Sequence, residues 1–277
     1  TVGTISSGGY QKAIISTASE RSYKGKLEVV AQPGLGFAEA VDMERDFVDM
    51  NASSVRDNYR GPSIGEDSLS IDTKMLDRYK FNFAGNSVLY EKKSETYTKI
   101  QLNSASNYAR LHLVNLIERQ RVRNGNLPLK NIILGCTHYP FLLDTLKKVV
   151  SELRMYEKNG VRIYDKVLPA DMEFIDPSIY TAKEVYAKLR EQGILSATPV
   201  TDRLNAFISI PASGLDAKNL DKDGNFTYEF KYGREAGAEV QSVDIVPFSI
   251  KNINPYNLQR IRERLPLTWS LIEKEIK

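Results

Sequence analysis

The chain has 277 residues, of which 42% are hydrophobic and 26% are charged, as in an ordinary globular protein. Its 38 basic and 35 acidic residues leave a net charge of +3, which argues neither for nor against a nucleic-acid partner. No apolar run approaches the roughly 18 residues of a membrane span, no secretory signal opens the chain, and the one cysteine cannot form an internal disulfide and fits a reducing cytoplasm.

The N-terminal part predicts one helix and one short strand. Residues 1–10 are rich in Gly, Ser and Thr, as in a turn between a strand and a helix. Either Ser6 or Ser7 can cap a helix over about 10–18, because a side-chain oxygen satisfies a free backbone N–H. Residues 27–31 (LEVVA) predict a strand, which the following Pro and Gly residues end.

From about residue 42 to residue 102 the pattern weakens. Residues 51–70 are polar and rich in turn formers, whereas residues 80–100 contain short alternating segments. This stretch predicts a β-hairpin or an irregular excursion from the fold.

The middle of the chain alternates helices with strands. Residues 105–121 and 141–153 have apolar positions at helical spacing. The run 131–135 (NIILG) is continuously apolar, which is typical of a buried parallel strand. Short strands are predicted at 161–164 and 174–176.

A helix over 181–192 follows, and Gly193 ends it. Strands alternating with helices indicate an α/β fold with a parallel sheet. Beyond about residue 200 the pattern becomes more β-like. Residues 206–210 predict a strand and 226–232 predict the second strand of a hairpin, before a short basic helix over 257–264.

The segment with the clearest chemistry runs from the strand at 131–135 into a turn and a helix, and it contains Cys136, Thr137 and His138. Ligands in open parallel sheets bind outside the carboxyl ends of the strands, where Cys136 lies. A helix that begins just after Pro140 would present free N–H groups and a partial positive charge, and both favour a thiolate and a bound carboxylate. His138 can exchange a proton with the thiol, and Thr137 offers a hydroxyl and an N–H to a carboxylate or ammonium group.

The seven residues Leu-Gly-Cys-Thr-His-Tyr-Pro, at 134–140, resemble the second cysteine motif of the glutamate racemases in the aspartate/glutamate racemase superfamily. Two weaker segments in the expected order add to the resemblance. Residues 3–10 (GTISSGGY) are similar to the turn that opens the second domain of that family, and residues 174–182 (FIDPSIYTA) to its Asp-Ser-Gly-x-x-Thr-Ala segment. Superfamily members that act on aspartate typically carry Glu where His138 stands, so the resemblance points to glutamate.

The resemblance implies a cofactor-independent racemase that interconverts L- and D-glutamate in the cytoplasm and supplies D-glutamate for peptidoglycan. Two thiols act, one on each face of the substrate, without pyridoxal phosphate. Carried over to this sequence, Cys136 is one of the two thiols and His138 assists it. Thr137 and Asp42 are the expected substrate-binding positions, and no metal or cofactor is expected. Met43 interrupts the acidic pair that the family has at Asp42.

The domain organisation departs from the family, because the hallmarks of its first domain are absent, including the first catalytic cysteine. We therefore expect an α/β, parallel-sheet racemase-type domain truncated at its N-terminus, with a first lobe removed or present as a separate piece. Residues 1–200 would form the second racemase domain, with a long insertion at about 43–102. Residues 201–277 would be an added, β-rich C-terminal region that packs partly on the missing lobe. A homodimer is a further arrangement that the added regions allow.

Two other functions stay open. The absent first cysteine and the added regions favour a catalytically incomplete racemase-like domain with a binding or regulatory role. A superfamily lyase or isomerase acting on another α-substituted acid is the second.

Other candidate residues have structural interpretations. His112 is expected to be a surface or boundary histidine, and Asp176 a cap of the following helix. Two distant histidines and one cysteine argue against a zinc site. The arginines at 119–123 and 260–264 are interpreted as solvated helix faces, so no nucleic-acid partner is expected.

Overall fold

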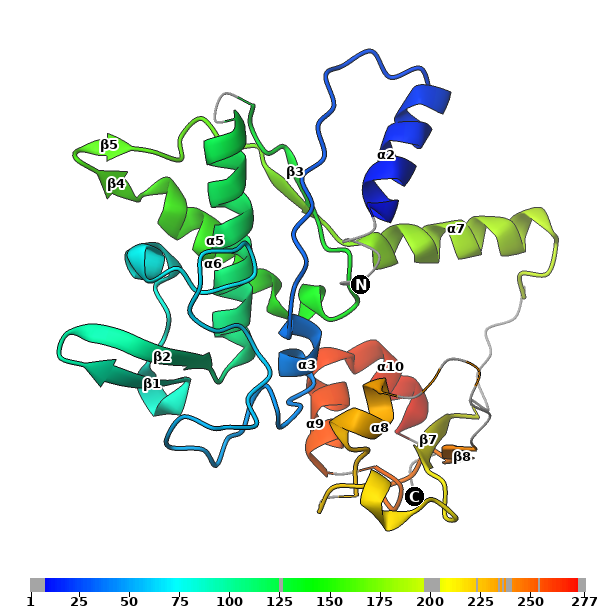
Figure 1. Cartoon of the computed structure of the whole chain (residues 1–277). Helices are drawn as coiled ribbons and strands as arrows, with labels where there is room; N and C mark the ends of the chain where they lie inside the picture. The colour runs from blue at the N-terminus through cyan, green and yellow to red at the C-terminus, as the bar shows by residue number, and fades with distance from the viewer. Residues whose placement is uncertain are drawn as a thin grey trace. The chain divides into compact units, whose positions relative to one another are not determined.

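The computed structural model describes residues 8–124, 127–196, 205–222, 224–233, 235, 237, 241–253 and 255–273. The chain forms two compact units, Thr1–Lys188 and Leu189–Lys277. Figure 1 shows the elements of both units by colour and label. The division predicted at about residue 200 stays a prediction. Within the described ranges, no helix is long and apolar enough to cross a membrane.

Helix α5 (Ala105–Asn124) forms the centre of the first unit. It contacts α3 (Phe37–Val41), α4 (Leu76–Tyr79) and α6 (Leu143–Arg154). The predicted helix is confirmed, but it is not amphipathic in the usual sense, because most of its side chains are buried. Its buried residues include apolar ones (Tyr108, Ala109, Leu111, Leu113, Val114, Ile117) and polar ones (Asn107, Arg110, His112, Asn115, Gln120).

The first unit also contains a two-stranded parallel sheet. Strand β3 (Asn131–Ile133) pairs with β6 (Glu173–Ile175), with Ile132 opposite Phe174. The parallel pairing is confirmed and is compatible with the predicted α/β class. The expected full burial of β3 is wrong, since Ile132 is buried while Ile133 is 47% exposed. Among the described residues the sheet has no third strand, so fewer neighbours cover its faces.

Residues 43–102 form an excursion that ends in the predicted hairpin. It contains the short helices η1 (Thr73–Met75), α4 and η2 (Ala84–Asn86). Strands β1 (Val88–Lys93) and β2 (Thr96–Leu102) pair antiparallel, which confirms the hairpin. Much of the rest is irregular backbone. Its polar groups bond to buried amide side chains on β2, on α5 and in the short connection between them, namely Gln101, Asn103, Asn107 and Asn115.

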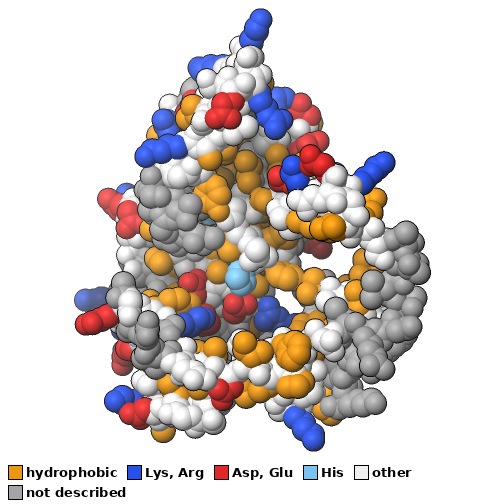
Figure 2. Space-filling model, turned by 90° about the vertical axis from the view of Figure 1, so that its right-hand side faces the viewer, with side chains coloured by type: hydrophobic (Ala, Val, Ile, Leu, Met, Phe, Trp, Pro, Cys, Tyr) orange, Lys and Arg blue, Asp and Glu red, His pale blue; other side chains and the backbone are white. Residues whose placement is uncertain are grey.

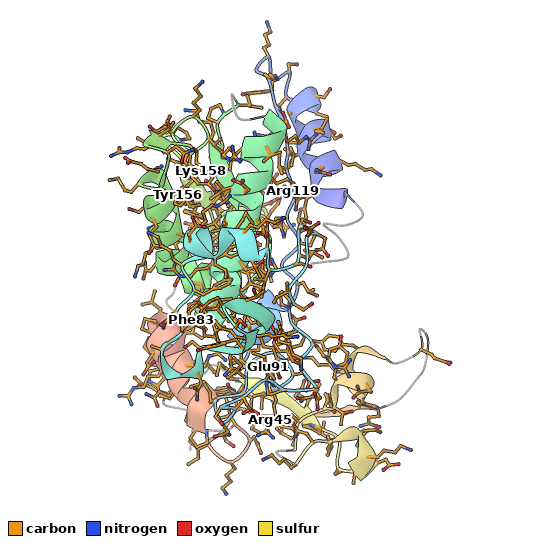
Figure 3. The ribbon with its side chains drawn as sticks, turned by 60° about the vertical axis from the view of Figure 1, so that its left-hand side comes forward. Arg45, Phe83, Glu91, Arg119, Tyr156 and Lys158 are labelled. Atoms are coloured by element: carbon orange, nitrogen blue, oxygen red, sulfur yellow. The ribbon has the colours of Figure 1, made fainter. Side chains whose placement is uncertain are left out.

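The strand predicted at 27–31 does not form. Its backbone carbonyls accept hydrogen bonds from side chains rather than from a neighbouring strand. Gln11 donates to the carbonyl of Val29 at 3.0 Å, and Arg119 donates to that of Ala31 at 2.7 Å. Figure 3 labels Arg119, whose side chain leaves α5 toward this extended segment. The local sequence pattern was therefore not sufficient for a strand, because no partner strand lies alongside it among the residues that the structure describes.

Helix α2 (Gly9–Glu20) confirms the first predicted helix, and Gly8 is its N-cap. The proposed caps Ser6 and Ser7 lie outside the described residues, as does most of the 3–10 segment.

The end of the first unit follows the predictions more closely. A short turn, η3 (Tyr139–Leu142), leads into α6, and the small hairpin of β4 (Glu157–Lys158) and β5 (Val161–Arg162) follows. Helix α7 (Pro177–Glu191) is capped by Asp176, whose carboxylate accepts the N–H of Ser178 at 2.9 Å, as expected. Gly193, beyond the helix, has the left-handed φ of 70°.

Helices α2 and α7 have no buried residues. Figure 2 shows the face that lies on the right-hand side of Figure 1, where α2 and α7 are labelled, and hydrophobic side chains are exposed on it.

The described part of the second unit is mixed rather than β-rich. Strands β7 (Phe207–Pro211) and β8 (Val243–Pro247) pair antiparallel, which confirms the strand at 206–210. The remaining elements are η4 (Ala217–Asn219), α8 (Tyr228–Tyr232), α9 (Pro255–Arg264) and α10 (Pro266–Ile272). The strand predicted at 226–232 is wrong. The hydroxyl of Thr227 accepts the N–H of Phe230 and caps a helix there.

Candidate active site

The thiol lies at the carboxyl end of the parallel sheet. After β3, the N–H of Leu134 still bonds to the carbonyl of Ile175 on β6, and the chain then turns at Gly135. Cys136 follows, and its carbonyl accepts the N–H of Tyr139. The helix expected to begin just after Pro140 is preceded by the 3₁₀ turn η3, so α6 begins only at Leu143. The thiol is thus held by a tight turn rather than placed directly at an α-helix N-terminus.

The thiol begins a line of three polar side chains. The Sγ of Cys136 lies 3.4 Å from Nδ1 of His138, and Nε2 of His138 lies 3.0 Å from Oδ2 of Asp42. The side chains of His138 and Asp42 are 28% and 47% exposed, so the line is open to solvent. The hydroxyl of Thr137 lies 3.5 Å from the same Nδ1 and is exposed. All four residues predicted for the site therefore lie together, although Asp42 is 96 residues away from His138 in sequence.

The end of α3 places Asp42. This residue caps the helix, and the N–H groups of the two residues after it bond back to the carbonyls of Ala40 and Glu39. This is the Schellman arrangement, which needs a left-handed residue directly after the cap. Met43 supplies it with a φ of 60°. The residue that interrupts the family's acidic pair is therefore the one that ends the helix and turns the chain at Asp42.

A stack of three rings packs beside the thiol turn. Tyr139 stacks on Phe37 with 4.4 Å between ring centroids, and Phe37 faces His112 at 6.0 Å. Burial raises the pKa of Tyr139, and the nearby charge of Cys136 raises it further. Tyr10 on α2 reaches the same loop, since its hydroxyl donates to the carbonyl of Gly135 at 3.3 Å.

None of these supporting rings was identified as part of the site from the sequence. The position of Tyr139 within the motif at 134–140 was a usable signal, whereas Phe37 had none.

His112 is a core residue, and its predicted surface or boundary position is wrong. It is only 5% exposed. Its Nε2 bonds to the carbonyl of Leu35 at 2.9 Å, whereas its buried Nδ1 has no hydrogen-bond partner among the described residues. Burial lowers the pKa of His112 from 6.5 to about 4, and the bond to Leu35 opposes this only in part. The folded protein thus holds a neutral imidazole behind the Phe37 ring.

We expect the stability of the fold to decrease as the pH is lowered, because of His112. The unfolded chain binds a proton below its pKa of 6.5, whereas the folded chain resists protonation down to about 4. Stability is therefore fully present above pH 6.5 and is lost as the pH falls toward 4. The pKa difference corresponds to about 3 kcal/mol.

Urea unfolding at several pH values checks this expectation in the wild type and in His112→Gln. The glutamine variant should lose much less stability across this window. Equal slopes in the two proteins would show that other groups carry the effect.

Among the residues that the structure describes, no three His, Cys, Asp or Glu side chains are grouped so that they could hold a metal ion.

Comparisons with known proteins relate part of this chain to glutamate racemases. A glutamate racemase of Carboxydothermus hydrogenoformans is 37% identical over 67 residues, which are 24% of this chain and 18% of the relative. A glutamate racemase of a Synechococcus species is 34% identical over 71 residues, or 26% and 20% of the two chains. The chain thus spans about a fifth of the length of these curated relatives. No family model and no solved structure matches it.

Proposed function

We propose that this chain carries one of the two proton-transfer groups of a cofactor-independent glutamate racemase, and that this group is the thiol of Cys136. The observation that carries the proposal is the line from the thiol through His138 to Asp42, at the carboxyl end of β3. An imidazole held between a thiol and a carboxylate can take up or return a proton without moving. The partial likeness to glutamate racemases supports the choice of substrate.

The reaction begins when the thiol of Cys136 transfers its proton to His138. This transfer leaves a thiolate beside an imidazolium ion, which Asp42 stabilises. The thiolate then takes the α-proton of glutamate and becomes a thiol. The electron pair of the broken C–H bond moves into the substrate carboxylate, which gains negative charge. Thr137 is exposed next to this thiol and donates a hydrogen bond to the substrate carboxylate.

Inversion also needs a proton donor on the opposite face of the substrate. The sequence contains one cysteine, so a second thiol has to come from another polypeptide segment or chain. A first lobe of the racemase type or a second copy of this chain are the two sources that we propose to test. The product, D-glutamate, would serve peptidoglycan synthesis in the cytoplasm.

Solvent deuterium provides the direct test. The full chain is incubated with L-glutamate in D₂O, and the α-proton is followed by NMR while a chiral assay detects D-glutamate. If Cys136 acts alone, deuterium enters L-glutamate with retention, because the thiol returns a solvent deuteron to the same face. D-glutamate appears if a second donor is present. Glutamate that neither exchanges its α-proton nor protects Cys136 from alkylation would contradict the proposal.

A catalytically incomplete domain that only binds glutamate is the second candidate. The single cysteine is the observation that favours it, because this sequence by itself cannot supply the two thiols of the racemase reaction. Under this alternative, glutamate slows alkylation of Cys136 but its α-proton does not exchange. Parallel incubations with L-aspartate test whether the chain acts on another α-substituted acid.

The Asp42→Asn variant should slow deuterium exchange by about tenfold, because an amide stabilises the imidazolium ion of His138 less than a carboxylate does. The effect is modest because Asp42 is 47% exposed and water screens its charge. Asp144→Asn is the matched control, since Asp144 is an exposed acid in the first turn of α6. An unchanged rate in Asp42→Asn would remove Asp42 from the site.

A further inference from the structure

The hydroxyl group of Tyr139 has a fixed position but makes no hydrogen bond within the described part of the chain. Its ring is fixed by the stack on Phe37 at 4.4 Å and an interplanar angle of 17°. Within the described part of the chain, no hydrogen-bond partner of its hydroxyl is found. The neighbouring Tyr10 differs, since its hydroxyl donates to the carbonyl of Gly135. A rigid phenol without a protein partner is unusual, because tyrosine hydroxyls in part-buried positions normally find one.

The backbone leaves room for this hydroxyl at one glycine. A Cβ atom built on Gly34 would lie 2.3 Å from the Tyr139 hydroxyl oxygen, which is far inside contact distance. The close approach therefore requires glycine at position 34. Gly34 is not in a left-handed conformation, so its role is to give space rather than to relieve backbone strain.

Tyr139 also lies in the same turn as the thiol, since its N–H bonds to the carbonyl of Cys136 at 3.1 Å. The charge of Cys136 is the largest contribution after burial among the causes that raise the pKa of Tyr139. The raised pKa keeps the proton on the Tyr139 oxygen, so the group is a neutral hydrogen-bond donor. Arg and Lys would provide a stronger donor to a carboxylate, but their charge would also bind the thiolate itself.

We infer that the Tyr139 hydroxyl donates a hydrogen bond to a carboxylate of the amino acid bound beside Cys136, and that Gly34 makes its position possible. The inference rests on the proposed function for the identity of the ligand. Tyr139 would be a substrate-binding residue that works beside Thr137. A donor fixed by ring stacking gives more affinity than a flexible one, because it loses little freedom on binding.

The test measures protection of Cys136 from iodoacetamide by L-glutamate, L-glutamine and L-aspartate in the full chain. Tyr139→Phe keeps the ring and its stack but removes the donor, and it should weaken protection by about tenfold or more, as for a lost hydrogen bond to a charged group. Gly34→Ala should weaken it similarly by displacing the hydroxyl. Tyr90→Phe is the control, since Tyr90 lies on the exposed side of the hairpin. The thermal midpoint of each variant separates ligand binding from folding.

The three amino acids separate the possible results. If Tyr139→Phe weakens protection by both glutamate and glutamine, the hydroxyl binds the α-carboxylate. If it weakens protection by glutamate alone, the hydroxyl binds the γ-carboxylate. Equal protection of the wild type and Tyr139→Phe by whichever amino acid protects would overturn the inference. Protection by aspartate but not glutamate would instead overturn the proposed substrate, while Tyr139→Phe still tests the hydroxyl. If none of the three protects the wild type, both are overturned.

Discussion

Replacing Cys136 by alanine should reduce deuterium exchange into glutamate by about 10³-fold, the contribution expected of a positioned acid–base group. The thiol is the base that accepts the α-proton in the proposed reaction, and no second cysteine in the sequence can replace it. The Cβ position is retained, so the loop between β3 and η3 should keep its backbone bonds. The measurement is the initial rate of loss of the α-proton signal in D₂O.

Two further variants make this result specific. Cys136→Ser keeps a hydrogen-bonding group of similar size but offers a much weaker acid, so its rate should also be low. Ser151→Ala removes an exposed hydroxyl from α6 and should leave the rate unchanged. If Cys136→Ala retains more than about a tenth of the rate, another group removes the proton, and the proposed role of the thiol would be wrong.

The site could be predicted from the sequence only where its parts are close in sequence. Cys136 and His138 are two residues apart in a turn, and this spacing already allows them to meet. The likeness to a family led to Asp42, because no local pattern connects residues 96 positions apart. Tyr139, Phe37 and His112 meet only because α3, η3 and α5 pack together. A stack of this kind depends on tertiary contacts that residue periodicity does not encode.

The fold shows the same limit. The hairpin, α5, α6 and the parallel strands were predicted because their periodicity and turn residues are local features. The segments 27–31 and 226–232 were assigned as strands in error. Arg119 and Gln11 bind the carbonyls of the first, and the capping hydroxyl of Thr227 begins a helix in the second. Both errors arose where a side chain competed with a strand partner for backbone groups.

The excursion at 43–102 was the least predictable part, because amide side chains hold it. Asn107 is completely buried, and its amide nitrogen donates to the carbonyls of Asn82 and Ser87, both at 2.9 Å. Its amide oxygen accepts the N–H of Asn82 at 2.9 Å. One side chain thus takes the place of a neighbouring strand for this backbone. An asparagine inside a helix is usually interpreted as a solvated position, so the sequence pattern concealed its role.

Asn107→Ala should lower the free energy of unfolding of the first unit by about 3 kcal/mol, because three hydrogen bonds are lost and buried backbone groups are left without partners. Urea unfolding followed by far-ultraviolet circular dichroism measures the change, while fluorescence of Trp269 reports on the second unit. Asn82→Ala is the matched control, since the exposed side chain of Asn82 only accepts the N–H of Ala84. It should cost about 1 kcal/mol or less.

A small effect of Asn107→Ala would mean that water replaces the amide and that the excursion is stabilised by its apolar contacts. A large effect would show that the long insertion depends on α5 for its structure. The same helix carries His112, which is distant from Cys136 in sequence but belongs to the ring stack of Tyr139, Phe37 and His112 that packs beside the site. The excursion and the candidate site would then share one structural support, and loosening the first should also slow proton exchange at the second.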